Sequence, residues 1–283
     1  METKIYSAKM EVIISDKRPT IMIGERINPT GKKKLSEALR VGDLDVVRRE
    51  AIAQVESGAH ILDVNVAASG VNEIEVLPKA VEAIMGVVDV PLCIDINNPA
   101  TIEETLKIYE GKAIVNSVSG EEKSLSEVLP LVKEYGAAVI GLTIGDKGIP
   151  KTTGKRLEIA HKIVERAEVI GIPREDIIID CLALSLGSDD QAGLVTLETI
   201  QRVKKELGVN QTLGASNISF GLPDRPLVNK SFLALAIGAG VTCPTVDAAK
   251  VKSTITAIDL ILGRDRFSQG FIKEYRHREA YFA

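Results

Sequence analysis

Eight short apolar segments, each followed by a stretch with helical spacing, recur along this chain and constrain its fold more than any other feature. They predict strands over 21–24, 60–66, 91–96, 113–117, 137–143, 177–181, 211–216 and 241–246. Their residues are apolar in continuous runs rather than in alternation, as expected for parallel strands that are buried on both faces. Helices are predicted after them, over 44–57, 74–87, 101–110, 124–135, 156–170, 197–207, 230–237 and 251–262.

Eight strand–helix units in 283 residues predict an α/β chain folded as a (β/α)8 (TIM) barrel, one domain over 1–283. An open doubly wound sheet would require a glycine-rich phosphate turn after an early strand, and no GxGxxG follows any strand here. Residues 1–20 alternate weakly and form an N-terminal extension in this scheme. In the C-terminal tail, 264–283, Phe267, Phe271 and Tyr275 have helical spacing. This spacing favours packing onto the barrel, with a homodimer contact as the alternative.

Polar side chains occur at or near the end of most predicted strands. They are Asp63, Asn65, Asp95, Asn116, Asp180, Asn217 and Asp247. The carboxyl ends of the strands are where (β/α)8 barrels place their sites. Any one of these residues could be a turn residue or a helix cap, and that alternative stays open for Asp63, Asn65 and Asp247. Together, Asp95, Asn116, Asp180 and Asn217 can line one pocket.

The stretch GASNISFGLPDRP, residues 214–226, follows the seventh predicted strand. It places Asn217 at the strand end, beside two serines and close to Arg225. An uncharged amide donor in that position suits a polar heterocycle. The alternative is that Asn217 caps the next helix, which is common for asparagine.

Composition limits the classes of function. Lys plus Arg is 35 and Asp plus Glu is 39, a balance that argues against general nucleic-acid binding. No apolar run approaches the roughly 20 residues of a membrane span, and the first residues lack a signal-peptide core. We therefore expect a cytoplasmic protein that binds no membrane. Cys93, Cys181 and Cys243 form no CxxC pair, so no metal site is predicted, and the scattered histidines predict no Ser-His-Asp arrangement.

The predicted pocket contains carboxylates and amides, with no nucleophile–base pair and no dense cationic patch. A carboxylate can accept two parallel N–H bonds from a planar amino-heterocycle, and a carboxamide can both donate and accept. This inventory favours the edge of a pterin or a purine. Sugar phosphates fit poorly, because no glycine-rich phosphate nest follows the seventh strand.

Seven motifs in this order resemble those of the pterin-binding methyltransferase family. They are IGERINPTGKK (23–33), ILDVN (61–65), CIDINNP (93–99), AIVNSVSG (113–120), LTIGDKGIPKT (142–152), IIIDCL (177–182) and GASNISFGLPDRPLVNKSFL (214–233). The resemblance extends from about 21 to about 262. It is closest to methyltetrahydrofolate:corrinoid protein methyltransferases and to the folate domain of cobalamin-dependent methionine synthase. The family has a (β/α)8 barrel, in agreement with the strand count.

The resemblance implies a role for each matching residue. Asp95, Asn116 and Asp180 match the positions that hydrogen-bond the pterin ring. Asn217 matches the amide that approaches N5, where the methyl group is carried, and Arg225 matches an arginine that contacts the aminobenzoyl or glutamate portion. Some corrinoid-protein methyltransferases have glutamine at the position of Phe220, and the phenylalanine here more closely resembles methionine synthase.

The activity implied is methyl transfer between N5 of tetrahydrofolate and the cobalt of a corrinoid, in a direction that the sequence leaves open. Asn217 would act as the catalytic residue by hydrogen-bonding N5 as its bond to the methyl group breaks. No DxHxxG sequence surrounds any histidine, so the corrinoid is expected on a separate partner protein. The chain itself is expected to hold no metal.

Two other functions are weighed against this one. Dihydropteroate synthase shares the barrel and the pterin pocket, but the opening motif here is GERINPTG rather than the NVTPDSFSDGG type. A noncatalytic folate-binding subunit would bind the pterin without turnover.

Overall fold

The computed structural model describes residues 1–282, and eight parallel strands in it form a barrel. In spatial order the strands are β3 (Ile23–Ile27), β4 (Ile61–Val64), β5 (Leu92–Asp95), β7 (Ile114–Ser119), β8 (Ala138–Leu142), β9 (Ile177–Asp180), β10 (Asn210–Thr212) and β11 (Thr245–Val246). β11 pairs in parallel with β3. A single parallel bridge between Gly214 and Thr245 joins the ring on its other side. The predicted (β/α)8 barrel is therefore confirmed, with each strand within a few residues of its predicted place.

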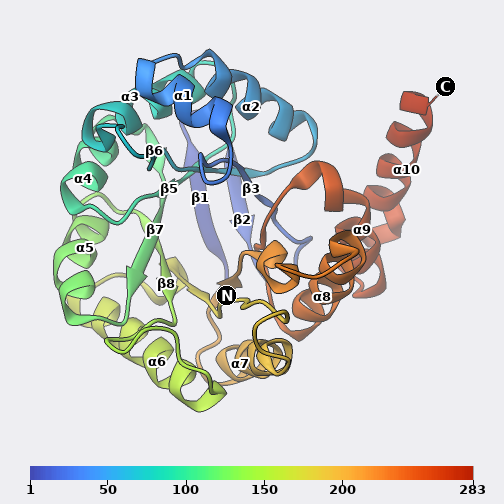
Figure 1. Ribbon diagram of the computed structural model, residues 1–283. Helices are drawn as coiled ribbons and strands as arrows, with labels where there is room; N and C mark the ends of the chain where they lie inside the picture. Colours follow the sequence, from blue (N-terminus) through green and yellow to red (C-terminus); the bar gives the residue numbers. More distant parts are fainter. Residues whose placement is uncertain (283) are drawn as a thin grey trace.

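Helices surround the barrel in the order of the chain (Figure 1). They are α2 (Asp45–Glu56), α3 (Glu73–Met85), α4 (Pro99–Ile108), α5 (Glu122–Glu134), α6 (Thr153–Ile170), α7 (Ala192–Glu206), α8 (Arg225–Ala239) and α9 (Ala248–Ile261). Local chemistry sets their ends. Asn98 caps α4 by accepting from the backbone N–H groups of Ala100 and Thr101. Gly171 ends α6 with φ +91°, a conformation that favours glycine. Within residues 1–282, no helix is both long and apolar enough to cross a membrane.

One helix was not predicted. α1 (Lys33–Val41) follows β3 and precedes α2. Its lysine-rich start obscures the helical pattern in the sequence, but Leu35, Ala38 and Leu39 recur at helical spacing and are buried.

The N-terminal hairpin seals one end of the barrel. β1 (Thr3–Ser7) and β2 (Glu11–Ile14) pair antiparallel, and β1 also pairs with the short β6 (Gly111–Lys112). Ile5 and Ile14 are fully buried in one cluster with the side chains that fill the barrel, including Ile23 and Ile61. The Nδ2 of Asn210, the first residue of β10, donates to the carbonyl of Ile14 at 3.1 Å. The hairpin thus covers the amino ends of the strands, and the carboxyl ends remain open.

The C-terminal tail forms α10 (Gln269–Phe282), which extends from the barrel beside α9 (Figure 1). Its contact with α9 is made by Glu274, which is buried and lies 3.0 Å from Lys252 Nζ. Phe267 and Tyr275 are 86% and 50% exposed. The tail therefore packs against α9 as predicted, but not through the predicted aromatic side chains: Phe267 and Tyr275 are largely exposed, Phe271 is half-buried, and the buried side chain at the contact is Glu274.

Candidate functional site

A cavity of about 440 Å³ opens at the carboxyl ends of the strands, and we call it the mouth cavity. Four of the residues that sequence reasoning grouped together line it: Asp95, Asn116, Asp180 and Asn217. The fifth, Arg225, lines a neighbouring cavity instead. The mouth cavity is lined as well by charged residues from β3, β4 and the segments after β3 and β11, among them Glu25, Lys32, Asp63, Asp247 and Lys250.

Two amide–carboxyl pairs build the wall formed by β4, β5 and β7. Asn116 Nδ2 donates to Asp63 Oδ1 at 3.1 Å, and Asn65 Nδ2 donates to Asp95 Oδ2 at 3.0 Å. Each amide nitrogen is therefore used within the protein. Asn116 Oδ1 and Asp95 Oδ1 are left as hydrogen-bond acceptors at the cavity.

The carboxyl groups of Asp63 and Asp95 influence each other. Burial raises the pKa of Asp63 well above its usual range, and the neighbouring charge of Asp95 raises it further. Burial also raises the pKa of Asp95, while hydrogen bonds from Asn65 and Asp63 oppose that rise. Two buried carboxyl groups this close cannot both ionise readily, so the raised pKa of Asp63 favours its protonated form beside Asp95.

Asp180, at the end of β9, forms the opposite wall. Its Oδ1 accepts the backbone N–H of Leu182 at 2.7 Å, which fixes the side chain and leaves Oδ2 for a ligand. Burial raises the pKa of Asp180 to about 6. The group is ionised at neutral pH but remains incompletely satisfied by the protein.

Asn217 lies in a different local structure from the one predicted. β10 ends at Thr212, and a short 3₁₀ helix, Ala215–Ser219, follows. The backbone N–H of Asn217 bonds to Gly214 O at 3.2 Å, and a side chain at Gly214 would place its Cβ 3.0 Å from Asn217 Nδ2. Asp224 occupies the position before α8, so Asn217 is not the cap of that helix. Among the hydrogen bonds of residues 1–282, none uses the Asn217 side chain, which stays exposed in the mouth.

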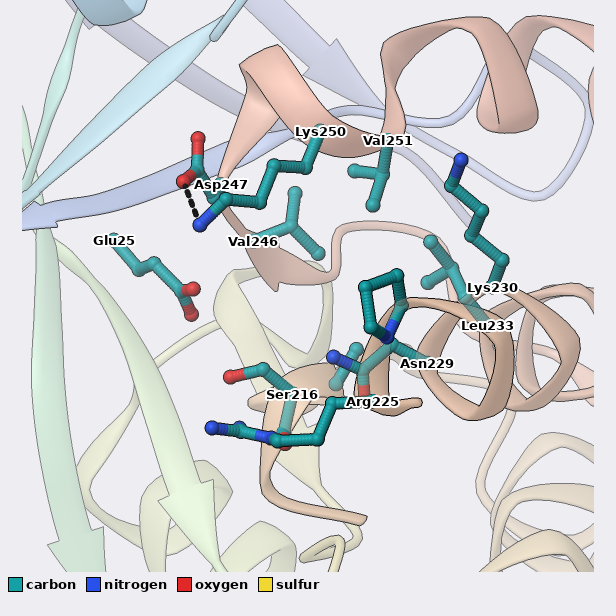
Figure 2. Close-up of a pocket in the computed structure, with 12 residues that line it drawn as sticks. Glu25, Ser216, Arg225, Asn229, Lys230, Leu233, Val246, Asp247, Lys250 and Val251 are labelled. Atoms are coloured by element: carbon teal, nitrogen blue, oxygen red, sulfur yellow. Dashed lines mark hydrogen bonds and ion pairs between the residues drawn. The ribbon is translucent and has the colours of Figure 1, made fainter. Parts of the chain in front are cut away.

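Arg225 is the first residue of α8. It donates from Nε to Ser219 Oγ at 3.0 Å and from Nη2 to Ser216 O at 3.1 Å, and its guanidinium lies 4.5 Å from the centre of the Phe220 ring. These contacts brace the loop that carries Asn217. Arg225 also lines a cavity of about 610 Å³ between α8 and α9, shown in Figure 2, which we call the side cavity.

Sequence reasoning missed Glu25. The first strand was predicted to end at Gly24, but β3 continues to Ile27 and brings Glu25 to the mouth cavity. Burial raises its pKa, and the charge of Asp247 adds to this. Asp247 itself is paired with Lys250 at 2.8 Å and with Arg26 at 3.4 Å. The signal in the sequence was that Glu25, a polar residue, directly follows the apolar run that ends at Gly24. Extending the predicted strand past Gly24 would have placed Glu25 among the strand-end residues.

The remaining candidate chemistry is sparse. The three cysteines are free and buried. Across residues 1–282 no group of three or more His, Cys, Asp and Glu side chains could hold a metal ion. Asp95, Asn116 and Asp180 thus present hydrogen-bond acceptors to the cavity and Asn217 presents an amide donor, which suits a ligand that has several N–H groups along one edge.

Comparison with known proteins gives the following similarities. A family model described as "Pterin binding enzyme" matches residues 24–247. A methylcorrinoid:tetrahydrofolate methyltransferase of Eubacterium limosum is 31% identical over 266 residues, covering 90% of this chain and 96% of that protein. A methionine synthase of Mycobacterium leprae is 30% identical over 286 residues, and the match spans 24% of its length.

Solved structures show the same fold at lower identity. Dihydropteroate synthase from Xanthomonas albilineans, in complex with 7,8-dihydropteroate, superimposes with a TM-score of 0.68. It is 18% identical, and the alignment covers 88% of this chain and 96% of that one. At this identity the likeness concerns the fold alone.

Proposed function

Because this chain belongs to the pterin-binding enzyme family, we propose that it transfers a methyl group between N5 of a tetrahydrofolate and the cobalt of a corrinoid carried by a separate protein. The observation that carries the proposal is the 31% identity to the Eubacterium limosum methylcorrinoid:tetrahydrofolate methyltransferase over nearly the full length of both chains. The same site serves both directions of transfer, by microscopic reversibility.

The mouth cavity fits the ring of the proposed substrate. The pyrimidine edge of a reduced pterin has several N–H donors. Asp95, Asn116 and Asp180 offer acceptors for them, and each of the three is held in orientation by a hydrogen bond within the protein. Such an edge would satisfy the half-used Asp180 carboxylate that burial leaves with a raised pKa.

Asn217 is proposed to act at the reacting nitrogen. When the N5–methyl bond breaks, its electron pair stays on N5, which is a poor leaving group unless it is protonated or hydrogen-bonded. The Asn217 amide is a donor with no partner among the described residues, and it is carried by a loop that Arg225 braces. A hydrogen bond that strengthens as charge develops on N5 lowers the barrier selectively.

The corrinoid supplies a cobalt centre that accepts or gives the methyl group. No residue of this chain is assigned to that cobalt. Access to the reacting nitrogen is through the open carboxyl end of the barrel, because the N-terminal hairpin closes the other end. The partner is therefore proposed to dock over the mouth.

A spectroscopic assay tests the function. The protein is mixed with free cob(I)alamin and 5-methyltetrahydrofolate, and in the reverse direction with methylcobalamin and tetrahydrofolate. We expect cobalt methylation and demethylation that depend on the protein. Tight folate binding with no turnover in either direction, also with native corrinoid proteins, would indicate a noncatalytic folate-binding subunit. Product formed from p-aminobenzoate and a dihydropterin pyrophosphate would indicate a dihydropteroate synthase instead.

A further inference from the structure

We propose that Arg156 is a positioning residue of the pterin pocket, and that it orients the carboxylate of Asp180 through the peptide group between Cys181 and Leu182. The inference rests on the proposed function, in which Asp180 accepts N–H groups of the pterin ring. Arg156 lies in the first turn of α6, and its side chain, 1% exposed, is among the largest that are fully buried. It is outside the lining of the mouth cavity, so it can affect a ligand there only through other residues.

The buried guanidinium of Arg156 bonds carbonyl oxygens rather than a carboxylate. Its Nε donates to Pro150 O at 2.9 Å. Its Nη1 donates to Cys181 O and to Leu182 O, each at 2.9 Å. Within residues 1–282 it forms no ion pair. An apolar side chain would fill the same space without the cost of desolvating a charge, so the charge itself calls for an explanation.

Two of these carbonyls belong to the turn that holds Asp180. Leu182 has φ +59°, a left-handed conformation that is unfavourable for a residue with a side chain. In this conformation its N–H donates to Asp180 Oδ1 at 2.7 Å. Arg156 bonds the carbonyl before the Leu182 Cα and the carbonyl after it, and so it holds both peptide planes that define this conformation. Thr196 Oγ1 also donates to Leu182 O, at 2.9 Å.

A single peptide group links Arg156 to Asp180. Its carbonyl, Cys181 O, accepts from the guanidinium, and its N–H, that of Leu182, donates to Asp180 Oδ1. A cation at the carbonyl end polarises the peptide and strengthens its N–H as a donor. The backbone of Asp180 is held separately, because its carbonyl accepts from Thr143 N at 3.2 Å and from Thr143 Oγ1 at 3.1 Å. The peptide bond to Oδ1 therefore fixes the side chain and leaves Oδ2 for a ligand.

The charge of Arg156 acts on Asp180 in the same sense as this bond. Burial raises the pKa of Asp180 to about 6, and the positive charge of Arg156 opposes that rise. The nearby thiols of Cys181 and Cys243 are neutral, because burial raises the pKa of each. Arg156 thus favours the ionised carboxylate, which is the form that accepts two N–H groups of a ligand.

The test is a double-mutant cycle with 5-methyltetrahydrofolate as the ligand. Arg156→Lys keeps the charge, but its single nitrogen cannot replace the forked donor set, so we expect affinity to fall by about 2- to 10-fold. The value of kcat at saturating ligand should change much less, because uniform binding is what is lost. In the Asp180→Ala background, Arg156→Lys should cause no further loss, because its effect passes through Asp180. Calorimetry measures affinity, and KM in the transfer assay replaces it for weak binders.

Arg264→Lys is the matched control. Arg264 is also buried, but it bonds Thr20 Oγ1 at 3.1 Å, before the first barrel strand and away from the mouth. This variant should keep wild-type affinity whatever its melting temperature. If Arg156→Lys does not fold, Thr196→Val replaces it in the cycle, because it removes a hydroxyl that bonds both the guanidinium and Leu182 O.

The outcomes separate the positioning role from the proposed function. Wild-type affinity in folded Arg156→Lys overturns the role and leaves the pterin site standing. An equal loss of affinity with and without the Asp180 carboxylate also overturns it, because Arg156 would then act by another route. If the wild-type protein binds no folate, the proposed function fails together with the positioning role.

Discussion

Asn116 on β7 donates its side-chain amide to Asp63 Oδ1 on β4 at 3.1 Å, across the intervening strand β5. This bond determines which end of the amide is used inside the protein, and so it leaves Asn116 Oδ1 as an acceptor at the mouth. Asn65 Nδ2 donates to Asp95 Oδ2 at 3.0 Å, and this bond leaves Asp95 Oδ1 as an acceptor at the mouth. The acceptors that Asn116 and Asp95 offer to a ligand are thus oriented by a supporting layer of two side chains, Asp63 and Asn65.

Replacement of Asp63 tests this layer. Asp63→Ala removes the acceptor of the Asn116 amide, so we expect Asn116 to lose its fixed orientation and folate affinity to fall by about 1–2 kcal/mol. Asp63→Asn retains a carbonyl acceptor for Asn116 and an amide donor toward Asp95, so it should keep most of the affinity. Calorimetry with folded variants measures both. Wild-type affinity in Asp63→Ala would show that the layer has no role in binding.

Asp180 is the most direct test of the pterin pocket. Its Oδ1 is used by Leu182, and Oδ2 is free for the ligand. Asp180→Ala should weaken folate binding by roughly 1–3 kcal/mol or more, because the ring N–H donors would be buried without an acceptor. Unchanged affinity in a folded variant would remove Asp180 from the site.

The barrel could be predicted from the sequence because its signal is repeated. Each buried parallel strand produces a continuous apolar run, and eight such runs with helices between them leave few alternatives. Boundaries were less accurate where the pattern is locally ambiguous. The apolar run ends at Gly24 although β3 continues to Ile27, and the lysine-rich start of α1 obscures the helical pattern. The N-terminal hairpin gave little signal, because its pairing with β6 lies about 100 residues away in the chain.

The site was predictable in position but not in its internal bonding. Strand ends gather at one face of a barrel, so Asp95, Asn116 and Asp180 could be grouped before any coordinates. The roles of Asp63 and Asn65 depend on which neighbour each side chain bonds, and spacing along the chain does not encode that. The side cavity depends on how α8 and α9 pack together, and this is likewise a tertiary property.

The raised pKa of Asp180 predicts that the stability of the fold depends on pH. Its pKa is about 6 in the folded protein against an ordinary value of 3.8. The folded state therefore holds the proton more tightly than the unfolded chain does. The resulting stabilisation is complete below about pH 3.8 and is lost as pH rises toward 6. Compared with the protein at low pH, where Asp180 is protonated, ionisation of Asp180 lowers the free energy of unfolding by up to about 3 kcal/mol above pH 6 and by roughly half of that at pH 5.

Asp180→Asn removes this cost while keeping an acceptor for the Leu182 N–H. We expect the ligand-free variant to melt at a higher temperature than wild type at pH 7.5, with a smaller difference at pH 5. Asp146→Asn is a suitable control, because Asp146 is exposed in the loop before α6. A melting difference for Asp180→Asn that is the same at both pH values would contradict the raised pKa.

Replacement of Asn217 distinguishes a role in catalysis from a role in substrate binding. Its side chain makes no hydrogen bond to the rest of the described structure, and the cap position of α8 belongs to Asp224. Asn217→Ala should therefore change the melting temperature little, whereas loss of a cap would cost about 1 kcal/mol. If the bond to N5 forms mainly in the transition state, kcat should fall by about 10²–10³ with a much smaller change in folate affinity. Single-turnover methyl transfer to cob(I)alamin at saturating methyltetrahydrofolate measures the rate, with calorimetry and a thermal melt beside it. Near-wild-type transfer would exclude the catalytic role, whereas a rate loss matched by an equal loss of affinity would make Asn217 a binding residue only.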